Sequence, residues 1–157
     1  MYYEAPESIV LIDPLVPPER ERFLAKLDQD VEHLGLPVLI LLTVPWHERS
    51  AAELAERYGA RRGDAPAGIV GLPFPQVEET VYWLPAHRAL VPGDTLFGAG
   101  DGGVTLCPDT YLGPEGIAAL RVSLLPLLEL PVERILVTHG DPVLRDGLAA
   151  LERALRA

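Results

Sequence analysis

The run Arg88-Ala-Leu-Val-Pro-Gly-Asp-Thr-Leu-Phe97 is the stretch that decides the fold of this chain. It begins with a short apolar segment, which predicts a strand, and then a Pro-Gly turn leads to a carboxylate at Asp94. Apolar residues resume at Leu96. A turn just after a strand can direct a side chain out of a sheet without disturbing the core. We therefore expect Asp94 to lie in any functional site of the protein.

A second run, Arg134-Ile-Leu-Val-Thr-His-Gly-Asp-Pro-Val143, has the same design. An apolar strand is predicted to end at His139-Gly140. A helix should follow, with Asp141 as its N-cap and Pro142 as its first helical residue. His139 is thus also placed at a strand end. A carboxylate and an imidazole on separate strand-to-loop turns favour a metal-binding or acid–base pair.

Composition limits the class of protein. The chain has 157 residues, of which 48% are hydrophobic, and this predicts one compact domain over residues 1–157. Its formal net charge of −10 argues against partners such as nucleic acid or anionic membrane surfaces. Cys107 is the only cysteine, so the chain has neither an internal disulfide nor a thiolate zinc cluster. The sequence shows no signal-peptide pattern and no apolar run of ~20 residues, so we expect a cytoplasmic protein.

Hydrophobic periodicity predicts helices that alternate with strands at both ends of the chain and short strands in its middle. Helices are expected over residues 19–33, 51–59, 114–130 and 142–156, with a kink at Pro126 in the third. Strands are expected over residues 8–13, 37–43, 68–72, 79–84, 88–91 and 135–138. This mixture predicts a single α/β domain with helices on the outer faces of its sheet. The pattern G-x-G-x-x-G at residues 98–103 opens no helix, which excludes a dinucleotide site.

Together these pieces resemble the metallo-β-lactamase fold superfamily, in the same order and over almost the whole chain. Val10-Leu-Ile-Asp-Pro14 is similar to its strand that ends in Asp, and residues 51–60 resemble the helix after its main metal-binding loop. The Gly-Asp of residues 89–97 resembles the segment with its bridging carboxylate ligand. Thr138-His-Gly140 resembles its last metal-binding histidine. The resemblance implies a four-layer αββα sandwich, truncated, with one or more leading strands absent.

The chain departs from the superfamily at the main ligand loop. Where members carry Thr-His-x-His-x-Asp-His, this chain has Thr43-Val-Pro-Trp-His-Glu-Arg49. The three ligand histidines fall on residues that have no lone pair for a metal: Val44, Trp46 and Arg49. Glu48 stands at the aspartate position, and His47 is one residue out of register. The middle ligand histidine has no good counterpart, because His87 precedes its strand.

The resemblance therefore implies a depleted metal site. Asp94 and His139 remain as ligands, and His47 or Glu48 is the candidate substitute. Catalytic zinc keeps three protein ligands and one open position, so one zinc, iron or manganese ion fits this set and two ions do not. Glu48 and Asp94 are then the candidate catalytic residues. Asp13 is expected to orient the loop that follows Thr43.

Two functions stay open at this point. In the first, slightly favoured by the loss of three histidines, the fold serves as a non-catalytic binding or vestigial module without metal. Arg49 then pairs with Asp94, and Trp46 lines a pocket for a small-molecule ligand. In the alternative, the protein is a single-metal hydrolase of an ester, thioester or phosphodiester. The leucine-rich helices leave homodimerisation open as well.

Overall fold

The computed structural model describes residues 1–112 and 116–157. The described chain divides into two compact units, residues 1–69 (unit 1) and residues 70–157 (unit 2), which we take one at a time. The expectation of one domain over residues 1–157 stays a prediction. Within the described residues, no helix combines the length and the apolar character needed to cross a membrane.

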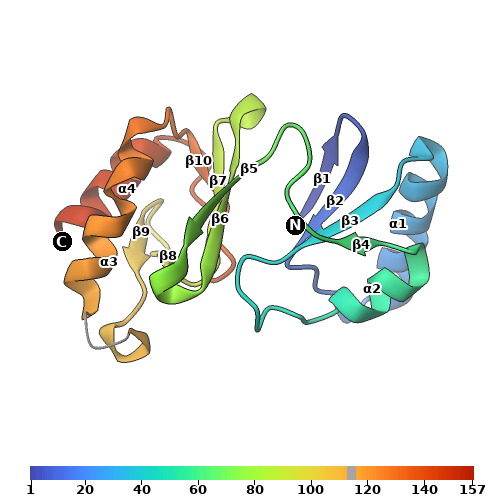
Figure 1. The fold of residues 1–157 in the computed structure, drawn as a ribbon, viewed down its shortest axis with the longest axis horizontal. Helices are drawn as coiled ribbons and strands as arrows, with labels where there is room; N and C mark the ends of the chain where they lie inside the picture. The colour runs from blue at the N-terminus through green and yellow to red at the C-terminus, as the bar shows by residue number, and fades with distance from the viewer. Residues whose placement is uncertain (113–115) are drawn as a thin grey trace. The chain divides into compact units, whose positions relative to one another are not determined.

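Unit 1 is built on a four-stranded sheet (Figure 1) with the order β1-β2-β3-β4. Its strands are β1 (Tyr2–Ala5), β2 (Ser8–Ile12), β3 (Val38–Leu41) and β4 (Arg61–Arg62). β1 pairs antiparallel with β2, and the other neighbours are parallel. The apolar runs in β2 and β3 form the two central strands, and nearly all of their residues are buried. The sequence did not predict β1. This strand precedes the one that leads to Asp13, whereas the resemblance implied that one or more leading strands are absent.

Two helices of unit 1 confirm the expected helices over residues 19–33 and 51–59. They are α1 (Arg20–Leu34) and α2 (Ala51–Tyr58). Each ends at a glycine in the left-handed conformation, where φ is 61° at Gly35 and 60° at Gly59, and this geometry satisfies a terminal carbonyl group. Both helices contribute leucines to a core that they share with β2 and β3. Unit 1 is therefore one layer of sheet and one layer of helices.

Unit 2 contains the short strands that the middle of the sequence predicts. Its larger sheet has the order β10-β7-β6-β5. The strands are β5 (Val70–Phe74), β6 (Glu79–Leu84), β7 (Ala89–Val91) and β10 (Arg134–Ile135). The first three form the expected antiparallel meander, whereas β10 joins β7 in parallel. A separate hairpin of β8 (Leu96–Gly98) and β9 (Val104–Leu106) spans the glycine-rich loop, which confirms that no helix opens there.

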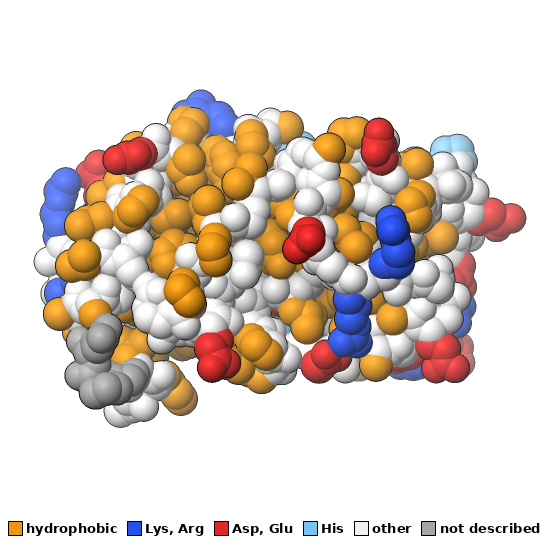
Figure 2. Space-filling model, viewed as in Figure 1, with side chains coloured by type: hydrophobic (Ala, Val, Ile, Leu, Met, Phe, Trp, Pro, Cys, Tyr) orange, Lys and Arg blue, Asp and Glu red, His pale blue; other side chains and the backbone are white. Residues whose placement is uncertain are grey.

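The helices of unit 2 differ from the expected ones at their ends. α3 (Gly116–Leu124) gives way to a 3₁₀ segment, Leu125–Glu129, because Pro126 has no N–H to continue the α-helix. The expectation of one kinked α-helix to residue 130 was therefore wrong. Its expected start at residues 114–115 lies outside the described residues. α3 and the later helix α4 (Gly147–Arg156) lie on the same side of the larger sheet (Figure 1), and Figure 2 shows hydrophobic side chains exposed over this region. In α3 Val122 is 67% exposed, and in the 3₁₀ segment Leu125 is 49% exposed.

The last helix begins later than the sequence predicts. α4 spans Gly147–Arg156, with Asp146 rather than Asp141 at the N-cap position. The reason is the buried Val143, whose backbone exchanges two hydrogen bonds with Ile135 at 2.8 and 2.9 Å. This antiparallel bridge holds residues around position 143 in an extended form, and a helix cannot start until it ends.

Candidate functional site

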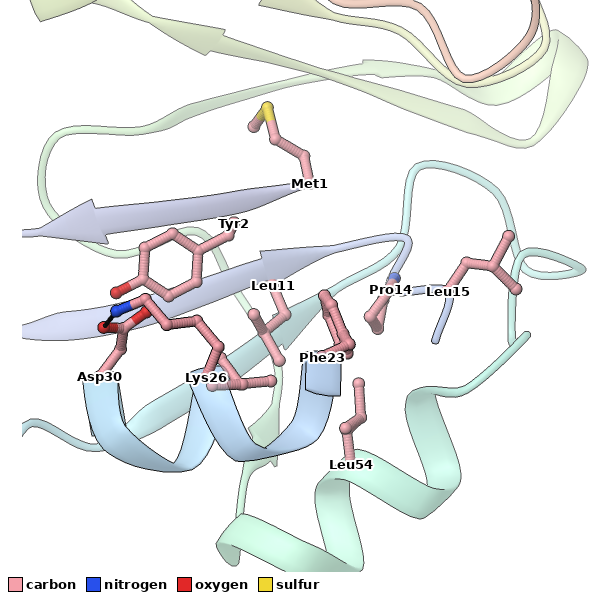
Figure 3. Close-up of a pocket in the computed structure, with 10 residues that line it drawn as sticks. Met1, Tyr2, Leu11, Pro14, Leu15, Phe23, Lys26, Asp30 and Leu54 are labelled. Carbon is pink, nitrogen blue, oxygen red and sulfur yellow. Dashed lines mark hydrogen bonds and ion pairs between the residues drawn. The ribbon is translucent and has the colours of Figure 1, made fainter. Parts of the chain in front are cut away.

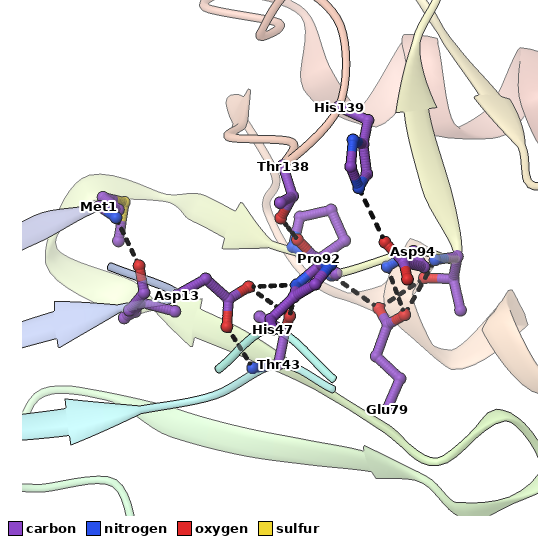
Figure 4. Close-up of polar contacts among 12 residues, drawn as sticks. Met1, Asp13, Thr43, His47, Glu79, Pro92, Asp94, Thr138 and His139 are labelled. Atoms are coloured by element: carbon purple, nitrogen blue, oxygen red, sulfur yellow. Dashed lines mark hydrogen bonds and ion pairs between the residues drawn. The ribbon is translucent and has the colours of Figure 1, made fainter. Parts of the chain in front are cut away.

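Parallel pairing in unit 2 brings the two predicted site segments together. β10 lies beside β7 in parallel register, with Arg134 opposite Ala89 and Ile135 opposite Leu90. Because parallel strands place their carboxyl ends at one edge of a sheet, the segments that follow them emerge side by side. Nε2 of His139 lies 3.1 Å from Oδ1 of Asp94 (Figure 4). The expected carboxylate–imidazole pair is therefore present.

A buried carboxylate fixes the turn that carries Asp94. Glu79, at the start of β6, is 3% exposed and accepts hydrogen bonds from the backbone N–H groups of residues 93, 94 and 95 at 2.8–2.9 Å. It also accepts one from Oγ1 of Thr95 at 2.7 Å (Figure 4). Burial raises the pKa of Glu79, and these four hydrogen bonds oppose the rise. Glu79 thus holds the turn by accepting a hydrogen bond from each of the backbone N–H groups of Gly93, Asp94 and Thr95.

Sequence reasoning missed Glu79. Glu79 falls at the start of a predicted strand, where a charged residue is common and does not by itself indicate a role. In β6 the side chains of Glu79, Val81 and Trp83 alternate onto one buried face. An acid in register with buried apolar residues must find hydrogen-bond donors, so this register was the signal available in the sequence.

Two glycines allow the segment with His139 to approach β8 closely. The N–H of Gly98 donates to the carbonyl of His139 at 2.8 Å. A Cβ atom on Gly98 would lie 2.2 Å from the carbonyl oxygen of Asp141, and one on Gly140 would lie 2.6 Å from the carbonyl oxygen of Gly98. Gly140 also has a φ of 84°, which side chains disfavour. Both positions therefore require glycine.

Further contacts position His139 and leave it accessible. Oγ1 of Thr138 donates to the carbonyl of Pro92 at 3.0 Å, which ties the His139 segment to the Asp94 turn. The ring of Phe97 lies 5.4 Å from the His139 ring, in a tilted arrangement. The side chains of His139 and Asp94 are 48% and 28% exposed, and Oδ1 of Asp94, the atom that faces His139, is itself buried.

Unit 1 holds a second polar cluster, at the carboxyl ends of β2 and β3. Asp13 follows β2, and its carboxylate accepts a hydrogen bond from the N–H of Thr43 at 2.8 Å and another from the Thr43 hydroxyl. These contacts support the prediction that Asp13 orients the loop after Thr43, which stays a prediction. Nδ1 of His47 lies 2.9 Å from the same carboxylate, and both side chains are buried (Figure 4). An N–H at Nδ1 that donates to Asp13 makes Nε2 the nitrogen that carries the lone pair, as in histidines that bind metals.

The other predicted site residues lie in unit 1. Glu48 is half exposed and forms an ion pair with Arg62, with oxygen–nitrogen distances of 2.5 and 2.9 Å. Trp46 is 57% exposed, and Arg49 is exposed with a φ of 37°. A catalytic role for Glu48, pocket roles for Trp46 and Arg49, and an ion pair between Arg49 and Asp94 all stay predictions.

An apolar pocket of about 300 Å³ in unit 1 contains none of the predicted site residues. Figure 3 shows its wall of hydrophobic side chains, which includes Leu11, Phe23 and Leu54. The charged side chains among its lining residues are Lys26 and Asp30, and they pair with each other at 2.6 Å. This pocket is therefore mainly apolar, and its two charged side chains neutralise each other.

The donors in unit 2 fit a divalent ion in kind and in spacing. An imidazole nitrogen and a carboxylate oxygen both bind zinc at about 2.0–2.2 Å, so two such ligands of one tetrahedral ion lie roughly 3.4 Å apart. The 3.1 Å between Nε2 of His139 and Oδ1 of Asp94 is close to that separation. Nitrogen with oxygen donors also suits iron and manganese.

Comparisons with known proteins bear on the fold. Neither protein-family models nor curated protein sequences give a match. Among solved structures, VMB-1 superposes with a TM-score of 0.60 at 12% identity, covering 99% of this chain and 81% of that one. The DIM-1 metallo-beta-lactamase gives 0.58 at 10% identity, with the same coverage. A metallo-beta-lactamase from Pontibacter korlensis gives 0.50 at 14% identity, covering 99% and 85%. The chain therefore has the α/β fold of the metallo-β-lactamases.

Proposed function

We propose that this protein binds one divalent metal ion through Asp94 and His139 and is a single-metal hydrolase. The observation that carries the proposal is the 3.1 Å contact between the two side chains, which lie in the loops after adjacent parallel strands. β10 ends at Ile135, so His139 lies in the loop after it and not at the strand end that the sequence predicts. A pair that only stabilised the fold would not need to stay open to solvent, yet both side chains do. Such a half-exposed pair on rigid elements is typical of a functional site.

The residues around this pair have distinct tasks under the proposal. Glu79 holds the turn of Asp94, so the carboxylate does not have to be ordered when an ion binds. Thr138 and Gly98 hold the segment of His139 in the same way. The bound ion would supply Lewis acidity and lower the pKa of coordinated water to about 7. That chemistry suits hydrolysis of an ester, thioester or phosphodiester.

A third protein ligand is required by zinc hydrolases of this kind. The sequence prediction names His47, with Glu48 as the other candidate. In its own unit His47 has the Nδ1 contact to Asp13 that metal-binding histidines use, whereas Glu48 is already paired with Arg62. These contacts support His47 over Glu48, and its role as a ligand is part of the proposal.

Elemental analysis of protein purified without chelator tests the proposal. We expect a metal-to-protein ratio near one, and loss of metal in Asp94→Asn and His139→Ala. His87→Ala is the matched control, because His87 is an exposed histidine of the same unit. Hydrolysis of aryl ester, thioester and phosphodiester substrates should follow metal content across these proteins. A ratio near one in Asp94→Asn would contradict Asp94 as a ligand.

A second candidate function is a metal-free binding module. It is favoured by the side chains at Val44, Trp46 and Arg49, which have no lone pair for a metal. Asp94 and His139 also contact each other at 3.1 Å without a cation. A metal ratio far below one, together with no hydrolysis after zinc, iron or manganese is added, would support this function and overturn the hydrolase.

A further inference from the structure

A cavity of about 430 Å³ in unit 2 lies apart from the residues of the proposed metal site. It is lined by the glycine-rich loop between β8 and β9, by β9 itself, and by one face each of α3 and α4. Neither Asp94 nor His139 lines it. Its volume falls in the range of sites for small organic molecules.

Two arginines from different helices line this cavity. Arg121 comes from α3 and Arg153 from α4. Within the described part of the chain, neither forms an ion pair, although the protein carries a net charge of −10. Nε of Arg121 is also buried without a hydrogen-bond partner among the described residues. A guanidinium that has lost water at one nitrogen and gained no acceptor favours a nearby anion.

One acidic side chain also lines this cavity and is hydrogen-bonded within its own loop. Asp101 lines the cavity, but its Oδ1 accepts the N–H of Gly103 at 3.0 Å within the loop. The remaining wall is largely apolar and includes Val104, Leu106 and Ile117. The cavity thus has two arginines and a largely apolar wall among its lining residues, and these are the two features that an amphipathic organic anion requires.

We propose that this cavity binds a small organic oxyanion. The carboxylate or phosphate group lies between Arg121 and Arg153, because planar guanidinium groups pair with both kinds of oxyanion. The apolar body of the ligand packs against the wall formed by β9 and α3. This assignment does not depend on the metal site or on the proposed hydrolysis.

Titrations monitored by amide NMR, with EDTA present to remove any metal, test the assignment. The probes are phenyl phosphate, benzoate and inorganic phosphate, which separate the two oxyanions and the apolar body. We expect saturable shifts at residues 103–106 and 121 with at least one organic probe. Arg121→Gln and Arg153→Gln should each weaken its binding by about tenfold or more, since each removes a charge-assisted contact.

Arg156→Gln is the matched control, because it removes the same charge from the same helix, where Arg156 pairs with Glu152 outside this cavity. We expect it to change affinity less than twofold. Equal weakening by all three variants would overturn the site in favour of general charge attraction. Inorganic phosphate that binds as tightly as the organic probes would overturn the apolar part, and no saturable binding would overturn the whole. Should Arg121→Gln fail to fold, Arg121→Lys and the exposed Arg153 still decide the result.

Discussion

The two units of this protein use one structural device with opposite results. In each, polar side chains follow neighbouring parallel strands and meet at the edge of the sheet. In unit 1, Asp13 and His47 meet in a buried cluster, with side chains 5% and 6% exposed. In unit 2, Asp94 and His139 meet at a surface where their side chains are 28% and 48% exposed.

This difference separates carboxylates that stabilise the fold from a pair that is available to bind a ligand. The buried carboxylate in unit 1 is saturated by donors from Thr43 and His47. The comparable saturated carboxylate of unit 2 is Glu79, and Asp94 is the acid that it holds in place. A buried and fully bonded acid is costly to remove, whereas an exposed pair contributes little to stability and is free to take part in chemistry.

The largest expected effect comes from Gly98. In Gly98→Ala the added Cβ would lie 2.2 Å from the Asp141 carbonyl oxygen, so the backbone must move. We expect the free energy of unfolding in urea to fall by about 3 kcal/mol or more. Gly63→Ala is the control, since a Cβ there meets nothing within 4 Å. Similar losses in both variants would show that the close approach to residues 140–141 is not the cause.

Next come the two buried carboxylates. Asp13→Asn and Glu79→Gln each replace an acceptor oxygen with a donor, so buried donors lose their partners. We expect each to reduce the free energy of unfolding by about 2–3 kcal/mol, since one unsatisfied buried group costs ~1–3 kcal/mol. Glu79→Gln should also weaken metal binding by about tenfold, as loss of a group that orients a ligand does. An unchanged metal affinity would restrict Glu79 to stability.

The pH dependence of stability distinguishes Glu79 from its amide variant. Burial raises the pKa of Glu79 above 4.5, so its folded form favours the proton more than its unfolded form does. The stabilisation linked to this proton is complete below pH 4.5 and is lost as the pH rises through the raised pKa. We expect Glu79→Gln to lack this fall in the free energy of unfolding, measured by urea titration across that range. Parallel curves for the two proteins would contradict the raised pKa.

A smaller effect is expected from the tie between the two segments of unit 2. Thr138→Val keeps the shape of the side chain but removes its hydrogen bond to the Pro92 carbonyl. We expect a loss of about 1 kcal/mol, together with NMR shift changes at His139. Thr105→Val, at an exposed position on β9, is the control. A loss in Thr138→Val no larger than in the control would show that this tie is unimportant.

The smallest effect on stability is expected at the proposed ligands themselves. Asp94→Asn and His139→Ala remove an ion pair that is well exposed, so each should change the free energy of unfolding by less than about 1 kcal/mol. The same variants should lose metal, which sets them apart from Asp13 and Glu79. A large loss of stability would instead assign Asp94 and His139 a structural role.

Strong local signals in the sequence predicted most of the fold. The sequence predicted the two helices of unit 1, the short strands of its middle and the turn at Asp94. Hydrophobic periodicity and the turn signals of Gly and Pro depend only on neighbouring residues, so they can be read without the fold. The errors arose where a distant residue decides local structure. Val143 is held by Ile135, so the helix expected at Pro142 starts at Gly147 instead. β1 escaped notice because Tyr2-Tyr-Glu-Ala5 has no apolar run and forms a strand by pairing with β2.

For the candidate site, residue types alone indicated Asp94 and His139, and the family resemblance added Asp13. The amino-acid order also predicts a depleted set of metal ligands, because side-chain chemistry at positions 44, 46 and 49 does not depend on the fold. Only the tertiary structure decided that His139 lies 3.1 Å from Asp94 and that Glu79 holds the turn between them. The physical reason is that parallel pairing joins residues far apart in the chain, and the local sequence does not record which segments pair.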